Sequence, residues 1–275
     1  MDLYCVMGNP VEHSKSPWIH ARFAELTGQT LQYGKRLIPL DGFAASVHAF
    51  IAEGGLGCNI TVPFKFEAAA LATQTSERAT LAQASNILSF RDGAILADNT
   101  DGAGLVSDIQ RNAGLALSGR HLLLIGAGGA AAGVLGPLLQ AGPASITVAN
   151  RTLHKATDLV TRHGGMALLQ KTELYAMDLQ GVRGAFDVVI NASASSLSGA
   201  EVPVPASTLK PGALAYDMMY GPAAQSFLSW ASEHGAVARD GLGMLVEQAA
   251  EAFLIWRGVR PPSNQVLTEL RAVMR

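Results

Sequence analysis

The fold of this 275-residue chain is decided by the stretch LLLIGAGGAA at residues 122–131. Its first four residues form an unbroken apolar run, as expected of a central strand in a parallel sheet. The sequence that follows reads G-x-G-x-x-A and lies directly between this strand and a helical pattern. There Gly126 permits a tight turn, Gly128 lets a pyrophosphate approach the backbone, and the small Ala131 permits close packing of helix on strand. This context favours dinucleotide binding over a purely structural glycine turn, with candidate residues Gly126, Ala127, Gly128, Gly129 and Ala130.

The end of the next predicted strand, residues 146–150, indicates which dinucleotide is bound. NAD enzymes usually place Asp or Glu there to bind the ribose 2′-hydroxyl. In this chain Asn150, Arg151 and Thr152 stand at that point, with Lys155 close by, so cations and small polar groups replace the acid. Arg151 can form a fork on a 2′-phosphate, and Lys155 adds a point charge. The alternative is an ordinary solvated basic turn; following the glycine motif, we predict NADP as the cofactor.

Composition excludes several classes of protein. Hydrophobic residues make up 49% of the chain and charged residues only 15%, so intrinsic disorder is excluded. The net charge of −2 gives no basic excess for nucleic acid or an anionic membrane surface. Residues 122–150 carry no charge, but their glycines and prolines fit strand, turn and helix better than a membrane span. The start of the chain lacks the pattern of a signal peptide, and Cys5 and Cys58 predict two reduced thiols in a cytoplasmic protein.

The apolar pattern divides the chain into two α/β domains. Strands and helices alternate over the first hundred residues, where residues 86–97 predict a hairpin across a turn at 91–93. From residue 102 the pattern is that of βαβ units. We predict a substrate-binding catalytic domain from residues 1–101 plus 240–275, whose C-terminal helices pack back on it. Residues 102–239 are predicted to form a Rossmann-type doubly wound parallel sheet that binds NADP.

Polar residues gather at the predicted strand ends of the first domain. Ser14 and Ser16 lie at a helix start, where two hydroxyls suit a carboxylate; alternatively, Ser16 only caps the helix ahead of Pro17. Asn59 and Thr61 alternate with apolar residues over the predicted strand 57–62, so both are expected on one face.

A possible proton-transfer pair follows from the same region. Lys65 falls in the first turn of a predicted helix, where a cation opposes the helix dipole. A solvated surface lysine is the plainer interpretation, but Asp101 could pair with Lys65 and orient it for acid–base work. Asp101 could instead cap a helix. Asn86 and Gln248 are further candidates for ligand contact, and His13 is a rival base without an evident partner acid.

Together these pieces resemble the shikimate dehydrogenase family, in order and over essentially the whole chain. The motifs that carry the resemblance are GNPVEHSKSP at 8–17, NITVPFK at 59–65, Asn86, NTDG at 99–102, GAGGA at 126–130, NRT at 150–152, NAS at 191–193, YDMMY at 216–220 and DGLGML at 240–245 with Gln248.

The resemblance implies reversible, NADPH-dependent reduction of 3-dehydroshikimate to shikimate, a step of aromatic amino-acid biosynthesis, in a cleft between two domains. It implies that Lys65 and Asp101 form the catalytic pair, with Lys65 as general acid/base. It further implies three groups of binding residues: Ser14 and Ser16 for the substrate carboxylate; Asn59, Thr61, Asn86, Asp101 and Gln248 for ring hydroxyls, with Tyr220 near the substrate; and Met218 and Gly241 beside the nicotinamide.

Three alternatives remain at this point. An NAD-dependent quinate/shikimate dehydrogenase would share the fold and the pair, but not the basic turn at 150–152. A sensing protein on the same scaffold would have lost the Lys65–Asp101 pair. A methylenetetrahydrofolate dehydrogenase is allowed by the fold but not by the two serines and the 59–65 motif. The expected partner is a small-molecule substrate, with neither nucleic acid nor membrane, for a monomer or homodimer without a metal.

Overall fold

The computed structural model describes residues 1–193 and 202–274, and it divides into two compact units. Unit 1 comprises Met1–Gly104 and Leu245–Arg275, and unit 2 comprises Leu105–Met244. The chain passes from one unit to the other within helix α5 (Asp101–Ser107) and within helix α9 (Leu242–Arg257). The assignment of substrate to one part of the chain and NADP to the other stays a prediction at this stage.

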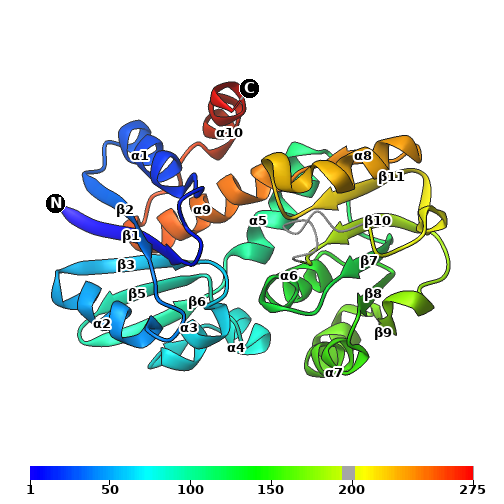
Figure 1. The fold of residues 1–275 in the computed structure, drawn as a ribbon, viewed down its shortest axis with the longest axis horizontal. Helices are drawn as coiled ribbons and strands as arrows, with labels where there is room; N and C mark the ends of the chain where they lie inside the picture. Colours follow the sequence, from blue (N-terminus) through cyan, green and yellow to red (C-terminus); the bar gives the residue numbers. More distant parts are fainter. Residues whose placement is uncertain (194–201, 275) are drawn as a thin grey trace. The chain divides into compact units, whose positions relative to one another are not determined.

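Unit 1 is built on a mixed six-stranded sheet in the order β2-β1-β3-β5-β6-β4 (Figure 1). The pairs β1–β2, β1–β3 and β4–β6 are parallel, and β5 is antiparallel to both of its neighbours. The predicted hairpin at 86–97 is confirmed as β5 and β6. The strands are β1 (Asp2–Gly8), β2 (Leu31–Leu37), β3 (Gly55–Ile60), β4 (Gln74–Thr75), β5 (Ile87–Arg91) and β6 (Ala94–Asp98).

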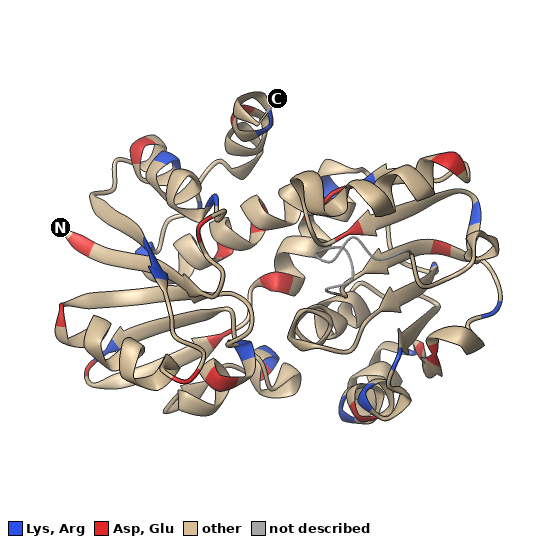
Figure 2. Ribbon diagram, viewed as in Figure 1, with Lys and Arg blue, Asp and Glu red and all other residues tan. Residues whose placement is uncertain are grey.

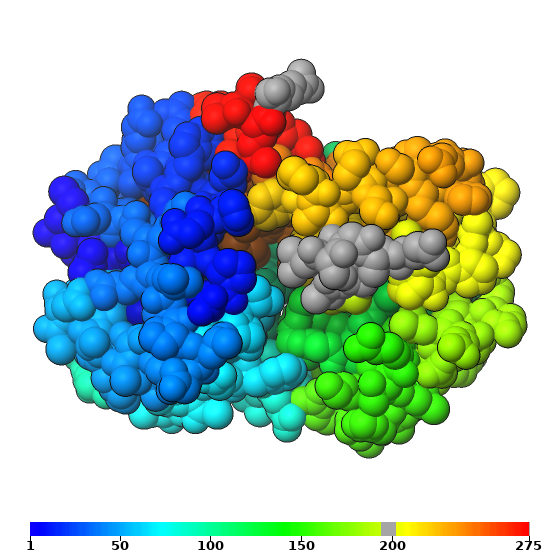
Figure 3. All heavy atoms as spheres, in the orientation of Figure 1, coloured from blue at the N-terminus to red at the C-terminus, as the bar shows by residue number. Residues whose placement is uncertain are grey.

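The helices of unit 1 bury the apolar faces of this sheet. Phe43, Phe50 and Phe64 form a core with strand residues on one side of the sheet, and Trp256 of α9 packs with Tyr4 in a separate cluster. The C-terminal helix α10 packs beside α1, as the red segment next to the blue one in Figure 3 shows. This agrees with the prediction that the C-terminal helices pack back on the first domain. The helices are α1 (Ser16–Thr27), α2 (Phe43–Ala52), α3 (Lys65–Leu71), α4 (Glu77–Ala82) and α10 (Ser263–Val273).

Unit 2 is a doubly wound parallel sheet in the order β12-β11-β10-β7-β8-β9, as predicted. The strand order reverses beside β7, so the crevice at the carboxyl ends of β7 and β10 is the place where such sheets bind ligands. Each strand pairs in parallel with its neighbours. The strands are β7 (His121–Ile125), β8 (Ser145–Asn150), β9 (Glu173–Asp178), β10 (Phe186–Asn191), β11 (Leu209–Asp217) and β12 (Val237–Arg239).

Helices and short helical turns cover this second sheet. Helix α6 follows β7 directly, and α7 connects β8 to β9. A π-helical turn, η1, continues α5 at the start of unit 2. The elements are η1 (Asp108–Asn112), α6 (Gly129–Gln140), α7 (Leu153–Gln170), η2 (Leu179–Gly181), η4 (Ala206–Thr208), η5 (Gly221–Ala224) and α8 (Gln225–Glu233).

The charged residues and the two cysteines are placed as the low net charge and the predicted reduced thiols suggest. Figure 2 shows basic and acidic positions interspersed along both units. Cys5 on β1 and Cys58 on β3 lie opposite each other in the strand register, and both are free and buried. Burial raises the pKa of the Cys5 thiol to about 12. Among the described residues, every helix is too short or too polar to cross a membrane.

Candidate active site

Lys65 and Asp101 form a close ion pair in unit 1, as the sequence predicted. Each is the first residue of a helix, Lys65 of α3 and Asp101 of α5. A carboxylate at that position is favourable to the helix dipole and a cation is not, so Asp101 compensates the ammonium of Lys65. The side chains are 15% and 6% exposed, so both members of the pair are largely enclosed. The backbone carbonyl of Lys65 accepts a hydrogen bond from the Ser85 N–H at 2.8 Å, which anchors the helix start.

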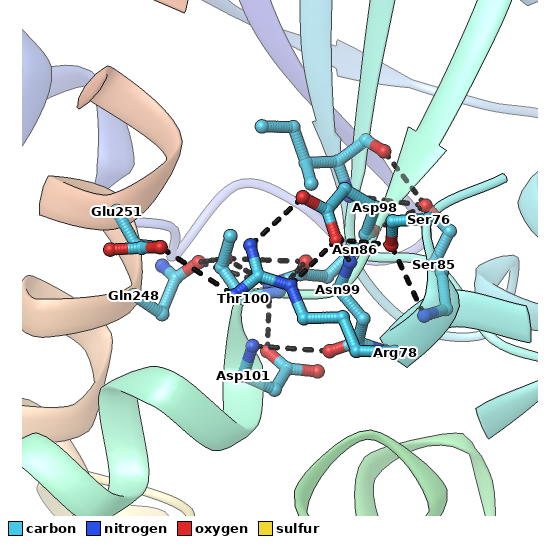
Figure 4. A network of polar contacts seen from close by, with 12 residues as sticks. Ser76, Arg78, Ser85, Asn86, Asp98, Asn99, Thr100, Asp101, Gln248 and Glu251 are labelled. Carbon is cyan, nitrogen blue, oxygen red and sulfur yellow. Dashed lines mark hydrogen bonds and ion pairs between the residues drawn. The ribbon is translucent and has the colours of Figure 1, made fainter. Parts of the chain in front are cut away.

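Asn86 connects Asp101 of this pair to Gln248, another predicted ligand residue (Figure 4). Its amide nitrogen donates to Asp101 Oδ1 at 2.9 Å and lies 3.1 Å from Gln248 Oε1. Thr100 closes the network: its N–H donates to Asn86 Oδ1 at 2.8 Å, and its hydroxyl lies 3.3 Å from the same Gln248 oxygen. The Gln248 amide nitrogen donates to the Leu245 carbonyl at 2.9 Å. Asn86, Asp101 and Gln248 are thus brought together, with their amide orientations set by mutual hydrogen bonds.

A second ion pair supports the chain segment that carries Thr100 and Asp101. Arg78 binds both oxygens of Asp98, with Nε–Oδ1 and Nη2–Oδ2 distances of 2.6 and 2.8 Å, and Ser76 donates to Oδ1 at 2.5 Å. Desolvation raises the pKa of Asp98, but the hydrogen bonds from Arg78 and Ser76 outweigh it and hold that pKa below its usual value. Asp98 ends β6, so this cluster fixes the strand end from which the network begins.

The two serines lie together, but Ser16 does not cap the helix as predicted. Helix α1 begins at Ser16 itself, with Lys15 in the N-cap position and no side-chain cap. Instead the Ser14 hydroxyl accepts the Ser16 N–H at 3.3 Å and lies 3.2 Å from the Ser16 hydroxyl. The cap prediction is wrong because the helix begins one residue earlier, with the Ile19 N–H donating to the Lys15 carbonyl at 3.1 Å. The rival base His13 is exposed.

Asn59 and Thr61 differ in their backbone setting. Strand β3 ends at Ile60 rather than Val62, so Asn59 is a buried strand residue while Thr61 begins the turn toward α3. The strand stops early because Thr61 and Phe64 form a turn, and Pro63 has no N–H to continue pairing. The Thr61 methyl group lies against Gly8, where an added Cβ would approach it to 2.2 Å.

The glycine turn of unit 2 has the backbone that a dinucleotide needs. Gly126 follows β7 with a φ of +110°, and an added Cβ would lie 3.1 Å from the Ala192 backbone. Gly128 precedes α6, whose first residue is Gly129, and a Cβ there would meet no atom within 4 Å. The space in front of Gly128 is therefore open, and the first N–H groups of a 12-residue helix lie beside it, as pyrophosphate binding requires. Ala127 and Ala130 flank these positions, and Ala131 is fully buried, as helix packing on the strand predicts.

The basic turn after β8 presents its cations to solvent. Arg151 and Lys155 are exposed, whereas Asn150 is partly buried and donates from its amide to the Thr152 carbonyl at 2.9 Å. Thr152 occupies the N-cap position of α7. An exposed guanidinium next to an α-helix start can take a phosphate without breaking an existing buried contact.

Met218 and Gly241, predicted beside the nicotinamide, lie against each other. A Cβ on Gly241 would approach the Met218 carbonyl oxygen to 2.3 Å, so only glycine fits there. The Met218 N–H donates to the Asn191 carbonyl at 3.0 Å, and the Gly241 N–H donates to the Met219 carbonyl at 2.8 Å. Tyr220 follows in the same unit, immediately before η5.

Several residues that build these regions have no role in the sequence-based prediction. Thr100 is fully buried between Asn86 and Gln248, and its only sequence signal is its place next to Asp101. Asp217 is also fully buried; it accepts from the Asn191 amide at 3.1 Å and from the Met219 N–H at 2.8 Å. A polar residue at the end of an apolar strand is the signal that could have found Asn191 and Asp217.

Three family models match the chain in sequence order. They are the shikimate dehydrogenase substrate binding domain over residues 6–88, shikimate/quinate 5-dehydrogenase over residues 108–201 and the shikimate 5′-dehydrogenase C-terminal domain over residues 241–271. A protein of Acidovorax sp. (strain JS42) named shikimate dehydrogenase (NADP(+)) is 68% identical over 273 residues, covering 99% of this chain and 97% of that protein.

Solved structures give the same result. An Ael1 enzyme from Pseudomonas putida is 46% identical with a TM-score of 0.89, and 98% of each chain is covered. A shikimate 5-dehydrogenase from Thermus thermophilus, solved in complex with NADP(H) and shikimate, is 29% identical with a TM-score of 0.85, and 99% of each chain is covered.

Proposed function

Because this chain belongs to the shikimate dehydrogenase family, we propose that Lys65 is the general acid/base of its reaction and that Asp101 orients it. The chain is an NADP-dependent oxidoreductase that interconverts 3-dehydroshikimate and shikimate. The observation that carries the proposed roles is the enclosed ion pair of Lys65 and Asp101, joined through Asn86 to Gln248.

The residues of unit 2 fit NADP. The open space before Gly128 and the free N–H groups of α6 would take the pyrophosphate, and Arg151 with Lys155 would take the 2′-phosphate. Met218 and Gly241 would lie beside the nicotinamide. The bound cofactor supplies or accepts the hydride, and the remaining chemistry belongs to this chain's own residues.

In the reducing direction negative charge develops on the ring ketone oxygen of the substrate. Lys65 Nζ gives a proton to that oxygen, and Asp101 stabilises the ammonium before the transfer. In the oxidising direction the same nitrogen takes the proton back from the hydroxyl. Asp101 is itself held by Asn86, so its second oxygen stays aligned on Lys65 while the charge changes.

Substrate orientation is proposed to come from two groups in unit 1. Ser14 and Ser16 hold the carboxylate through their hydroxyls. The ring hydroxyls are held by a second group, which consists of Asn59, Thr61, Asn86, Asp101 and Gln248. Tyr220 of unit 2 is proposed as a further contact. A cytoplasmic location is proposed as well, supported by the free thiols of Cys5 and Cys58.

A matrix of substrates and cofactors tests this assignment. The purified protein is mixed with shikimate or quinate and with NADP or NAD, and nicotinamide absorbance is followed. Fast turnover confined to shikimate with NADP is expected. Equal turnover with NAD would contradict the role of Arg151, and the absence of turnover in every combination would contradict the role of Lys65.

A further inference from the structure

An aromatic cluster in unit 1 contacts Asn59, one of the residues proposed to bind substrate. It consists of His20 on α1, Tyr33 on β2 and three aromatic neighbours, Phe23, Phe253 and Trp256. Tyr33 reaches out of this cluster: its hydroxyl donates to Asn59 Oδ1 at 2.6 Å, a short and strong contact. The Tyr33 hydroxyl thus links this aromatic cluster to the Asn59 amide.

The cluster holds the Tyr33 ring in one place. His20 is fully buried, and its ring is stacked on that of Tyr33 with 4.2 Å between centroids and an interplanar angle of 5°. Within the described part of the chain, neither ring nitrogen of His20 has a hydrogen-bond partner. Burial lowers the pKa of His20 to about 3 against a smaller opposing effect of the Asn59 side chain, which keeps the imidazole neutral, and its ring packs on that of Tyr33.

The protonation of Tyr33 makes its hydroxyl a permanent donor. Desolvation raises the pKa of Tyr33 well above its usual value, so the proton stays in place at any working pH. A hydroxyl that keeps its proton can only donate to the Asn59 amide oxygen, which has no proton to give.

We propose that Tyr33 is a positioning residue that fixes which end of the Asn59 amide faces the substrate. With Oδ1 occupied by the Tyr33 proton, Asn59 presents its Nδ2 as a donor, and this nitrogen lies 3.4 Å from the Asn86 carbonyl oxygen. Asn59 then donates to an oxygen of the substrate and discriminates against a substrate that lacks this oxygen. This inference rests on the proposed function of unit 1 and adds a source of its specificity.

The test is Tyr33→Phe, which keeps the stacked ring and removes only the hydroxyl. Its matched control is Tyr4→Phe: Tyr4 is the register partner of Tyr33 on β1, is buried and stacks on Trp256. KM and kcat are measured for shikimate and for analogues that each lack one ring hydroxyl, and thermal unfolding reports that the variant is folded.

Tyr33→Phe is expected to raise the KM for shikimate about tenfold, the loss of one well-placed hydrogen bond, with kcat little changed. The KM for one of the deoxy analogues should stay constant, so discrimination between it and shikimate falls about tenfold. Tyr4→Phe should leave that ratio unchanged. Equal effects of Tyr33→Phe on shikimate and on every analogue would overturn the proposal, because a merely structural role acts on all substrates alike.

A double-mutant cycle shows whether Tyr33 acts through Asn59. If it does, Tyr33→Phe has no further effect on KM in an Asn59→Ala background. Additive effects of the two substitutions would overturn the proposal. Failure of the proposed function is a separate outcome, because the unaltered enzyme would then fail to turn over shikimate at all.

Discussion

The proposed binding regions of the two units are built from different chemical groups. In unit 1 the proposed site is made of side chains that are buried and bonded to one another, as in the set Asn86, Thr100, Asp101 and Gln248. In unit 2 it is made of backbone at a glycine turn, together with the exposed cations Arg151 and Lys155. Side chains locked in a network supply fixed geometry for chemistry, whereas backbone and solvated charge supply affinity for a phosphate-bearing group. Substitutions in unit 1 should therefore act on turnover and selectivity, and substitutions in unit 2 on cofactor binding.

The largest effect is expected at Lys65. Lys65→Ala should lower kcat by about 10²- to 10⁴-fold, the range for a lost general acid/base, with little change in KM for shikimate. Lys65→Arg is the control, because a guanidinium keeps the ion pair with Asp101 but does not release its proton. Steady-state rates in both directions measure the effect. Near-normal turnover by Lys65→Arg would show that charge alone, rather than proton transfer, is required.

Arg151 should produce the next largest effect, confined to one cofactor. Arg151→Ala is expected to raise the KM for NADP about 10- to 100-fold, because a charge-assisted hydrogen bond contributes about 1.5–3 kcal/mol. The KM for NAD should remain the same. Arg120→Ala is the matched control, since Arg120 precedes β7 and therefore lies at the opposite edge of the parallel sheet. A parallel loss for both dinucleotides would contradict 2′-phosphate recognition.

Substitutions at two glycines of the same turn should affect NADP binding and fold stability separately. Gly128→Ala meets open space and should leave the thermal midpoint unchanged, while it raises the KM for NADP about tenfold by crowding the pyrophosphate. Gly126→Ala must adopt a φ of +110° against the Ala192 backbone and should destabilise the fold by about 1–3 kcal/mol. Thermal unfolding and cofactor titration of both variants measure the difference. An unchanged KM for NADP in Gly128→Ala would contradict backbone recognition at this turn.

The smallest effect is expected for the pH dependence of the free energy of unfolding, through His20 in the aromatic cluster of unit 1. The pKa of His20 is lowered from 6.5 to about 3, so its neutral form stabilises the fold fully above pH 6.5. Between those values the unfolded chain binds the proton and the native one does not, so the free energy of unfolding falls by about 1.4 kcal/mol per pH unit as the pH drops. His20→Phe should flatten this slope by that amount in urea unfolding at pH 7, 6 and 5. An unchanged slope would mean that His20 is already protonated in the folded protein.

Local patterns in the sequence predicted much of this fold, and contacts between distant residues set the rest. The glycine turn and the hairpin at 86–97 could be predicted because their signals lie within a few residues of each other. Strand β9 has no such signal, because it lies at a sheet edge and its residues are only partly buried. The cap at Ser16 was mispredicted because the first helical hydrogen bond is made to the Lys15 carbonyl, one residue earlier than the Ser-Pro pattern indicates.

The candidate site, too, could be predicted from the sequence only in part. Lys65 and Asp101 could be proposed as a pair because each stands in a motif, but their fixed orientation depends on Asn86 and on Gln248, which lies 162 residues further along the chain. Tyr33 has no motif at all; only the structure brings its hydroxyl to Asn59, 26 residues away. Hydrogen bonds between side chains that are so far apart leave no periodicity in a single sequence.

The two thiols provide a consequence of a different kind. Both cysteines of the chain, Cys5 and Cys58, lie on neighbouring strands of unit 1 and are buried, and unit 2 contains no cysteine. An alkylating reagent reacts with the exposed thiolate, so it modifies this protein only when β1 or β3 opens. The rate of pulse alkylation therefore measures how readily unit 1 opens. It reports on that unit alone and requires no engineered label, because unit 2 has no thiol to react.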